Sequence, residues 1–377
     1  MELFAEPWVG YLLSLAVAAA ICAALTPLLI RWAVRRGMLD HPTGHKSHVT
    51  PTPYLGGLAI VLGFVLAVAG AALLRVAAGS TTGGLSELLV ILGVALAVSL
   101  VGLLDDLRGL SVTTRFGVQL VAAGTLWASG VRVDLVPVEV AGIAVIDLLI
   151  TVVWIVGITN AMNLLDNMDG LSAGIATIAA LWFGLLGALN GQILVAALAF
   201  ALAGGTLGFL RQNRPPARIY MGDAGSLFLG ILLATLGIKL DFATDAVPAA
   251  LIPILVLTVP VMDTTLVVLA RLKHGVSPFR GGRDHISHRL VKVGIPVPVA
   301  VLLIVGAGFA HGWMALVLSR VDLLTGLLAA GLVFLLDTVL FVLLAKVPVY
   351  DNSRGRDLVI ARREHIGATV TPPEPPR

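Results

Sequence analysis

Two acidic side chains beside two amides make up the stretch of this sequence most suited to chemistry. Asp166 and Asp169 lie three residues apart, and Asn160 and Asn163 precede them with no lysine or arginine in between. Residues three apart share one face where the backbone is helical, and carboxylate and amide oxygens are ligands that hard divalent cations prefer. Helix capping by Asp169 would explain one acid, but it would not explain both acids together with both amides.

Two further acids, Asp105 and Asp106, are adjacent at the end of an apolar run and are followed by Arg108. The carboxyl end of a helix is an unfavourable place for negative charge, and neighbouring carboxylates repel each other unless a cation neutralises them. A divalent-cation site or an acid and base site would account for the pair. The alternative is a solvated helix end in which Arg108 is the partner.

Glycines and arginines surround Asp223 in the segment 211–226. A Pro-Pro pair ends the preceding helix, and the glycines near Asp223 let the backbone approach a ligand closely. We expect a helix to begin at about Gly225, with its N-terminal amides directed at an anion such as phosphate. The alternative is that the three arginines of the segment only set the membrane topology.

The segment 271–293 is the most basic, with six lysines or arginines and three histidines. Its run from Arg283 to His288 is suited to binding zinc, to contacting phosphate or to forming an anionic-lipid surface, and the spacing does not decide among these. In the segment 31–54, Lys46 is open between a functional role and that of an ordinary topology-setting lysine. We do not expect the three histidines near Lys46 to bind a metal, because zinc sites seldom take all their ligands from one flexible loop.

The composition places all these segments at the borders of membrane-spanning helices. Of the 377 residues, 58% are hydrophobic and only 12% are charged, and the mean hydropathy is +0.98. A membrane span needs about 20 apolar residues. The sequence therefore predicts an all-α polytopic bundle of eleven spans, or ten without the short stretch 225–239. The predicted spans are 9–30, 55–75, 87–104, 115–131, 142–160, 172–190, 192–210, 225–239, 247–270, 295–318 and 323–346.

Alternation of these spans from an external N-terminus brings the polar segments to one membrane face. That face receives 21 of the 25 lysines and arginines, so the positive-inside rule makes it cytoplasmic, together with the C-terminus. We expect one catalytic domain, 1–346, and a tail, 347–377, that is disordered at its end. The active site would be built from the segments 31–54, 105–115, 160–171, 211–226 and 271–293.

Clustered acids, glycine-rich turns and cations on one face are the recurrent parts of phosphoryl transfer, and the membrane setting suggests a lipid substrate. A competing hypothesis is a transporter that uses the acids as a cation path. A transporter would show internal repeats and acids deep within several spans, whereas we detect no repeat. Two acids do lie within spans. We leave Asp263 open between a substrate-cavity acid and a structural network, and we favour a hydrogen bond inside the bundle for Asp337.

Four segments together resemble the polyprenyl-phosphate N-acetylhexosamine-1-phosphate transferases of glycosyltransferase family 4. They are Asp105-Asp106, Asn160 to Gly170, Tyr220 to Ser226, and Ser277 to Arg289. Members of this family move a sugar 1-phosphate from a UDP-sugar to a polyprenyl phosphate and release UMP. The resemblance runs from about residue 31 to 290, and four segments in the same order are far more specific than any one alone.

The resemblance implies a role for each matching residue. Asp223 would coordinate Mg2+, for which Mn2+ can substitute, and Asp105 and Asp106 would act at the phosphate and beside the metal. Asp223, Asp105, Asp106, Asp284, His285 and His288 are the expected catalytic residues. The substrate-binding residues would be Lys46, Asn160, Asn163, Asp166, Asp169, Asn213, Tyr220, Ser226 and Arg283, with the Tyr220 ring stacked on uracil.

The chain departs from the family pattern at two positions. Asn167 stands where a glycine is usual, and we expect asparagine to tolerate the left-handed backbone of that turn. Ser287 precedes His288 where many members have a histidine pair, which puts any role of Ser287 in doubt. The form of this last segment resembles the undecaprenyl-phosphate and decaprenyl-phosphate branch that uses UDP-GlcNAc.

From this branch we expect transfer of GlcNAc 1-phosphate to begin synthesis of a cell-envelope glycan at the plasma (inner) membrane. Another UDP-N-acetylhexosamine or UDP-MurNAc-pentapeptide is the alternative donor. The expected partners are a UDP-sugar, a polyprenyl phosphate and the membrane, with no nucleic acid and with a homodimer as an open possibility.

Overall fold

The computed structural model describes residues 7–40, 51–77, 84–133, 143–242 and 251–349. These residues form an all-α bundle with one short antiparallel pair, β1 (Leu39–Asp40) and β2 (Thr52–Pro53). The helices are α1 (Pro7–Arg36), α2 (Gly56–Ala77), α3 (Leu85–Arg108), α4 (Val112–Ala128), α5 (Ile143–Leu165), α6 (Leu171–Leu189), α7 (Ile193–Asn213), α8 (Gly222–Lys239), α9 (Leu251–Val256), α10 (Thr258–Lys273), α11 (Ile286–Lys292), α12 (Val297–Leu318) and α13 (Leu323–Ala345).

Within the described residues, nine helices are long and apolar enough to cross a membrane: α1, α2, α3, α5, α6, α7, α8, α12 and α13. The predicted polytopic all-α fold is therefore confirmed. The helix α4 matches the predicted span 115–131 but has only 17 residues. The predicted span 247–270 is instead divided into α9 and α10, because Pro260 has no amide hydrogen to donate to the carbonyl of Val256, where α9 ends.

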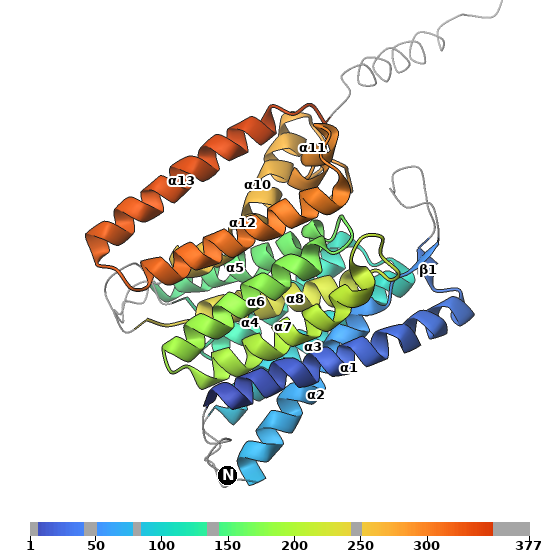
Figure 1. The fold of residues 1–377 in the computed structure, drawn as a ribbon, viewed down its shortest axis with the longest axis vertical. Helices are drawn as coiled ribbons and strands as arrows, with labels where there is room; N and C mark the ends of the chain where they lie inside the picture. The colour runs from blue at the N-terminus through green and yellow to red at the C-terminus, as the bar shows by residue number, and fades with distance from the viewer. Residues whose placement is uncertain (1–6, 41–50, 78–83, 134–142, 243–250, 350–377) are drawn as a thin grey trace, which may run out of the picture.

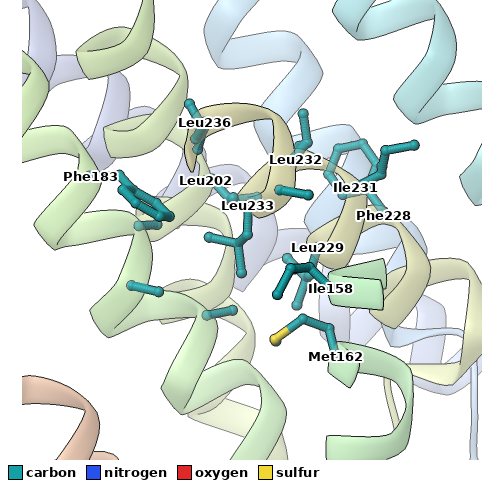
Figure 2. Close-up of a cluster of buried hydrophobic side chains, with 14 of the residues drawn as sticks. Ile158, Met162, Phe183, Leu202, Phe228, Leu229, Ile231, Leu232, Leu233 and Leu236 are labelled. Atoms are coloured by element: carbon teal, nitrogen blue, oxygen red, sulfur yellow. The ribbon is translucent and has the colours of Figure 1, made fainter. Parts of the chain in front are cut away.

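The helix α8 lies at the centre of the bundle, and 78% of its most apolar stretch is buried. A membrane helix that is apolar around its whole circumference can bury every face among its neighbours. Figure 2 shows Phe228 and Leu232 of α8 in a cluster with Met162 of α5 and Phe183 of α6. The stretch 225–239, the shortest span predicted from the sequence, therefore forms the core of the molecule.

Small residues bring α8 close to its neighbours. A Cβ atom added to Gly230 would lie 2.5 Å from the Cα atom of Thr159 on α5, and one added to Gly102 of α3 would collide with the backbone of Asp223. Close approach through glycine is a common way for membrane helices to gain packing contacts. As a result, the end of α3 that carries Asp105 and Asp106 lies directly against the start of α8.

The helices of the C-terminal third lie on one side of the bundle, and α1 and α2 lie on the opposite side (Figure 1). The strand β1 and the helix α11 lie at the same end of the molecule as the C-terminal ends of α1 and α13. Only 6% of the most apolar stretch of α13 is buried. This helix therefore has little protein around it for most of its length.

We predict that Gly230→Ala lowers stability by about 1–3 kcal/mol, because the added methyl group meets the backbone of α5 and forces the helices apart. Gly93→Ala is the control, since a Cβ atom at Gly93 of α3 meets nothing within 4 Å. Thermal unfolding of the detergent-solubilised variants measures the difference. Equal midpoints for the two variants would show that α5 and α8 are not in close contact.

Candidate active site

The site begins with an acid that caps another helix. Oδ1 and Oδ2 of Asp106, at the end of α3, accept hydrogen bonds from the backbone amides of Asp223 (2.9 Å) and Ala224 (3.1 Å) at the start of α8. Negative charge at a helix N-terminus satisfies unpaired amides and interacts favourably with the helix dipole. We predicted from the sequence that a phosphate would occupy this N-terminus and that the helix would begin near Gly225. The expected helix start is wrong, since α8 begins at Gly222. Asp106 accepts hydrogen bonds from two of the amides that we expected to face a phosphate, whose binding stays a prediction.

Gly222 permits this arrangement. Its φ angle is +72°, and a Cβ atom there would lie 2.6 Å from Oδ2 of Asp106 and 2.6 Å from the carbonyl oxygen of Tyr54. Any side chain would therefore be strained by the backbone and would also push Asp106 away from the amides.

The side chain of Arg115 bridges two of the acids, Asp105 and Asp223. Nη1 of Arg115, in the first turns of α4, lies 2.7 Å from Oδ2 of Asp105 and 3.0 Å from Oδ2 of Asp223. Ser111 begins α4 by accepting a hydrogen bond from the amide of Thr114, which turns the helix back toward α3. Sequence analysis named Arg108 as the alternative partner and missed Arg115. The capping serine and the first turn of a predicted span were the signals that could have found it.

The two amides before the acids have different surroundings. Nδ2 of Asn163 donates to Oδ1 of Asp223 at 2.7 Å and to Oγ of Ser226 at 2.9 Å, so Asn163 belongs to the acid cluster. Asn160, about one turn earlier in α5, donates to the side chain of Gln119 in α4 and to the carbonyl of Val156. The structure therefore separates Asn160 from the acids that it neighbours in sequence.

Asp166 lies in the turn after α5, near the acids of the other helices. The pKa of its carboxyl is raised to about 7, mainly by burial and also by the negative charges of Asp223, Asp106 and Asp169. Carboxylates grouped in this way cannot all be ionised without a positive charge nearby. We define the acid cluster as Asp105, Asp106, Asp166 and Asp223.

Asp169 and Asn213 connect the turn after α5 to the loop after α7. Oδ2 of Asp169 accepts a hydrogen bond from the amide of Ala217 (2.8 Å). The buried Asn213 accepts from the amide of Gly170 (3.0 Å) and donates to the carbonyl of Ile219 (2.9 Å). Both ends of the Asn213 amide are therefore used within the protein, which suits a role in shaping the two loops.

Tyr220 lies in the loop after α7, next to the strand β2. Its amide donates to the carbonyl of Pro53 at 2.7 Å, and its carbonyl accepts from the amide of Gly56 at 2.9 Å. Burial raises the pKa of the phenol, and nearby acids, Asp169 foremost, raise it further, while a hydrogen bond with Thr52 opposes them. The ring is thus neutral at physiological pH. Lys46, which we expected in the same region, lies outside the described residues.

The residues 283–289, which we call the histidine segment, are held in place by buried acids and arginines. Nδ1 of His285 lies 2.7 Å from Oδ2 of Asp263, whose Oδ1 accepts from the amide of Ile286 at 2.7 Å. Asp263 is fully buried, so the structure decides the question that the sequence left open: this acid belongs to a network that orients His285. The pKa of His288 is lowered to about 4, mainly by burial and also by the neighbouring His285 and Arg283. His288 is therefore neutral at pH 7.

Asp284 lies apart from the acid cluster. Its two oxygens receive hydrogen bonds from Nε and Nη2 of Arg271, each at 2.8 Å, in a buried bidentate ion pair. This geometry favours a structural role over the catalytic one expected from the sequence. Arg283, the neighbouring residue, is exposed at the surface.

The two departures from the family pattern are in contact with each other. Oγ of Ser287 donates a 2.6 Å hydrogen bond to Oδ1 of Asn167, whose Nδ2 donates to the carbonyl of Leu164. Our expectation of a left-handed backbone at Asn167 is wrong: among the described residues only glycines have a positive φ angle, and Gly170 supplies it in this turn with a φ of +76°. Asn167 is therefore needed for its side chain and not for its backbone.

The acid cluster has the oxygen donors that suit a hard divalent cation such as Mg2+. Within the described ranges, no three acid, histidine or cysteine side chains already form a metal-holding group. The reason is visible in the contacts: Arg115 neutralises Asp105 and Asp223, and Asp106 faces the amides of α8. The donor types fit a metal, and a metal would compete with Arg115 for Asp223.

Comparison with known proteins places this geometry in a family. Residues 88–241, which contain the whole acid cluster, match the family described as glycosyl transferase family 4. The chain is 34% identical over 299 residues to a probable undecaprenyl-phosphate N-acetylglucosaminyl 1-phosphate transferase of Bacillus subtilis (strain 168), covering 78% of this chain and 81% of the relative. The chain belongs to glycosyl transferase family 4.

Other family members extend this comparison. A decaprenyl-phosphate N-acetylglucosaminephosphotransferase of Mycolicibacterium smegmatis is 35% identical over 323 residues, covering 77% of this chain and 78% of the relative. A phospho-N-acetylmuramoyl-pentapeptide-transferase of Desulforamulus reducens is 35% identical over 244 residues, covering 59% of this chain and 70% of the relative. The two relatives named as GlcNAc 1-phosphate transferases are thus matched over more of this chain than the muramoyl relative.

We predict that Asp284→Ala destabilises the protein by about 3–5 kcal/mol, because it leaves the buried guanidinium of Arg271 without its carboxylate. The double variant Arg271→Met, Asp284→Ala should recover part of this loss. As a control, Lys239→Gln removes one partner of the partly exposed ion pair with Glu87, whose side chains are 32% and 27% exposed, and should cost less than about 1 kcal/mol. Chemical unfolding in detergent measures all three, and equal losses for Asp284→Ala and Lys239→Gln would contradict the prediction.

Proposed function

We propose that this protein transfers N-acetylglucosamine 1-phosphate from UDP-N-acetylglucosamine to a polyprenyl phosphate, undecaprenyl or decaprenyl, and releases UMP. An oxygen of the lipid phosphate attacks the phosphorus that carries the sugar, and the bond from that phosphorus to the oxygen of UMP breaks. The observation that carries the proposal is the acid cluster where α3, α5 and α8 meet, within the region shared with the family. The names of the two relatives described as N-acetylglucosamine phosphate transferases support N-acetylglucosamine as the sugar.

In this proposal the acid cluster holds the cation and the phosphates. Asp223 and Asp105 would hold Mg2+, or Mn2+ in its place, and the bound ion supplies positive charge to the diphosphate. With the metal bound, Asp105 and Asp223 would no longer need Arg115 to neutralise them. The guanidinium of Arg115 would then be available to phosphate oxygens. Asp106 stays at the start of α8 and keeps Asp223 in position. This proposal gives the metal to two of the three acids named in the sequence analysis, and it leaves Asp106 with the amides of α8 instead.

The remaining residues line the donor and acceptor sites. Asp166, Asp169 and Tyr220 would form the nucleotide wall, with the flat phenol ring stacked on uracil. The neutral His288 would contact the sugar or the diphosphate beside His285. We place the site on the cytoplasmic face of the plasma membrane, because most of the positive charge lies on that face of the predicted topology.

The direct test is turnover with a panel of donors. Purified protein is incubated with polyprenyl phosphate, Mg2+ and UDP-sugars labelled in the sugar, and the label is counted in the lipid phase. We expect labelled lipid with UDP-GlcNAc and much less with UDP-MurNAc-pentapeptide. Absence of labelled lipid with every donor would overturn the proposed reaction, and preference for the pentapeptide donor would reassign the substrate.

We predict that Asp223→Asn lowers turnover about 100- to 1,000-fold, because the acid cluster loses a charge that acts on the transferring phosphate. Asp322→Asn is the matched control, since Asp322 is an exposed cap at the start of α13, where asparagine also caps well. Turnover at several Mg2+ concentrations, together with thermal unfolding, measures the effect. Wild-type rates and Mg2+ dependence in Asp223→Asn would remove Asp223 from the metal site.

We also predict that Asp263→Asn lowers turnover about 100-fold, because the amide cannot hold His285 in the orientation that the carboxylate fixes. Asp337→Asn is the control: Asp337 likewise bonds a histidine, His311, at 3.0 Å, but between α12 and α13. The predicted effect is on kcat more than on KM for the donor. Similar losses in the two variants would mean that Asp263 only stabilises the fold.

A further inference from the structure

A cavity of about 480 Å³ lies between the C-terminal ends of α10 and α13. None of the four acids of the acid cluster lines it, and neither Asp nor Glu is among its lining residues. The helix α10 packs against α5, which leads into the site, and also against α13. The cavity is therefore a feature separate from the site described above.

The lining changes from apolar to cationic along the helix axes. Leu269 of α10 and Phe341 of α13 line it about one turn before the helix ends, and Lys273 and Lys346 line it at the helix ends. Both lysines are exposed, and neither ammonium group forms an ion pair within the described part of the chain. Apolar walls that end in unneutralised lysines are complementary to a molecule with an apolar body and an anionic head.

Arg289 connects this cavity to the histidine segment. It lines the cavity, and its Nη1 donates to the carbonyl oxygens of Leu344 (2.9 Å) and Val347 (3.0 Å) at the end of α13. Its Nε donates to the carbonyl of Asp284 (2.9 Å), the residue before His285. Of the residues of α13, only Gly326 and Leu344 are buried, so this contact is a main attachment of the helix.

We propose that the cavity binds an anionic phospholipid of the surrounding membrane. Lys273 and Lys346 hold its phosphate, and its acyl chains lie along Leu269 and Phe341, which braces α13 against α10 and so steadies Arg289. A soluble phosphate would leave the apolar walls uncovered, and Leu269 is 53% exposed. The acceptor lipid is a poorer occupant, because its phosphate has to reach the acid cluster, which does not line the cavity.

The test measures lipid binding directly, so its outcome does not depend on the proposed reaction. The full chain is purified in mild detergent and titrated with phosphatidylglycerol or phosphatidylcholine, and bound lipid is counted by native mass spectrometry. We expect one tight phosphatidylglycerol site that is about 30-fold weaker in the double variant Lys273→Gln, Lys346→Gln. The control double variant Arg31→Gln, Arg35→Gln removes two exposed cations from the end of α1 and should leave the tight site intact.

Two competition arms identify the occupant. Inorganic phosphate at millimolar concentration should not displace the lipid, and polyprenyl phosphate should not displace it one for one. Displacement by inorganic phosphate would show a simple anion site, and displacement by polyprenyl phosphate would show an acceptor site; either result overturns the proposal. So would equal phosphatidylglycerol affinity in the two double variants. Hydrogen exchange gives a second readout: the lipid should protect residues 341–347 in wild-type protein and not in Lys273→Gln, Lys346→Gln.

Discussion

A carboxylate at the end of one helix satisfies the unpaired amides at the start of another, and the site is arranged around that contact. Asp106 of α3 reaches the first amides of α8 only because Gly102 and Gly222 let the two backbones approach. The first amides of a helix have no partner within that helix, and Asp106 supplies one from another helix. The contact fixes the direction of the Asp223 side chain at the start of α8. Asp223 in turn accepts hydrogen bonds from Asn163 and Arg115 and so determines the positions of these two side chains.

The acid cluster is also a balance of charges near the membrane surface. Arg115 joins Asp105 and Asp223, hydrogen bonds from Asn163 and the α8 amides absorb part of the remaining negative charge, and burial holds Asp166 at a raised pKa. A group of acids with one shared cation is poised to exchange that partner for another positive charge. The same principle operates in the histidine segment, where each buried acid has a basic neighbour.

Hydropathy and the alternation of spans predicted most of the fold and the meeting of the polar segments. Those signals depend on residue type and segment length, which the sequence states directly. They do not specify how each helix is rotated about its axis, and the rotation decides which side chains meet. Asn160 therefore faces Gln119 and not the acids, Asp284 faces Arg271, and Asp106 accepts hydrogen bonds from amides that we expected to face a phosphate. The division at Pro260 was missed because hydropathy does not register a missing backbone hydrogen bond.

The hydrogen bond between Asn167 and Ser287 joins residues 120 positions apart in the chain. Each residue supplies what the other needs: a glycine at 167 would give the serine no acceptor, and a histidine at 287 would meet the asparagine with a larger ring. The hydrogen bond therefore ties the turn that carries Asp166 and Asp169 to the start of α11, which carries His288.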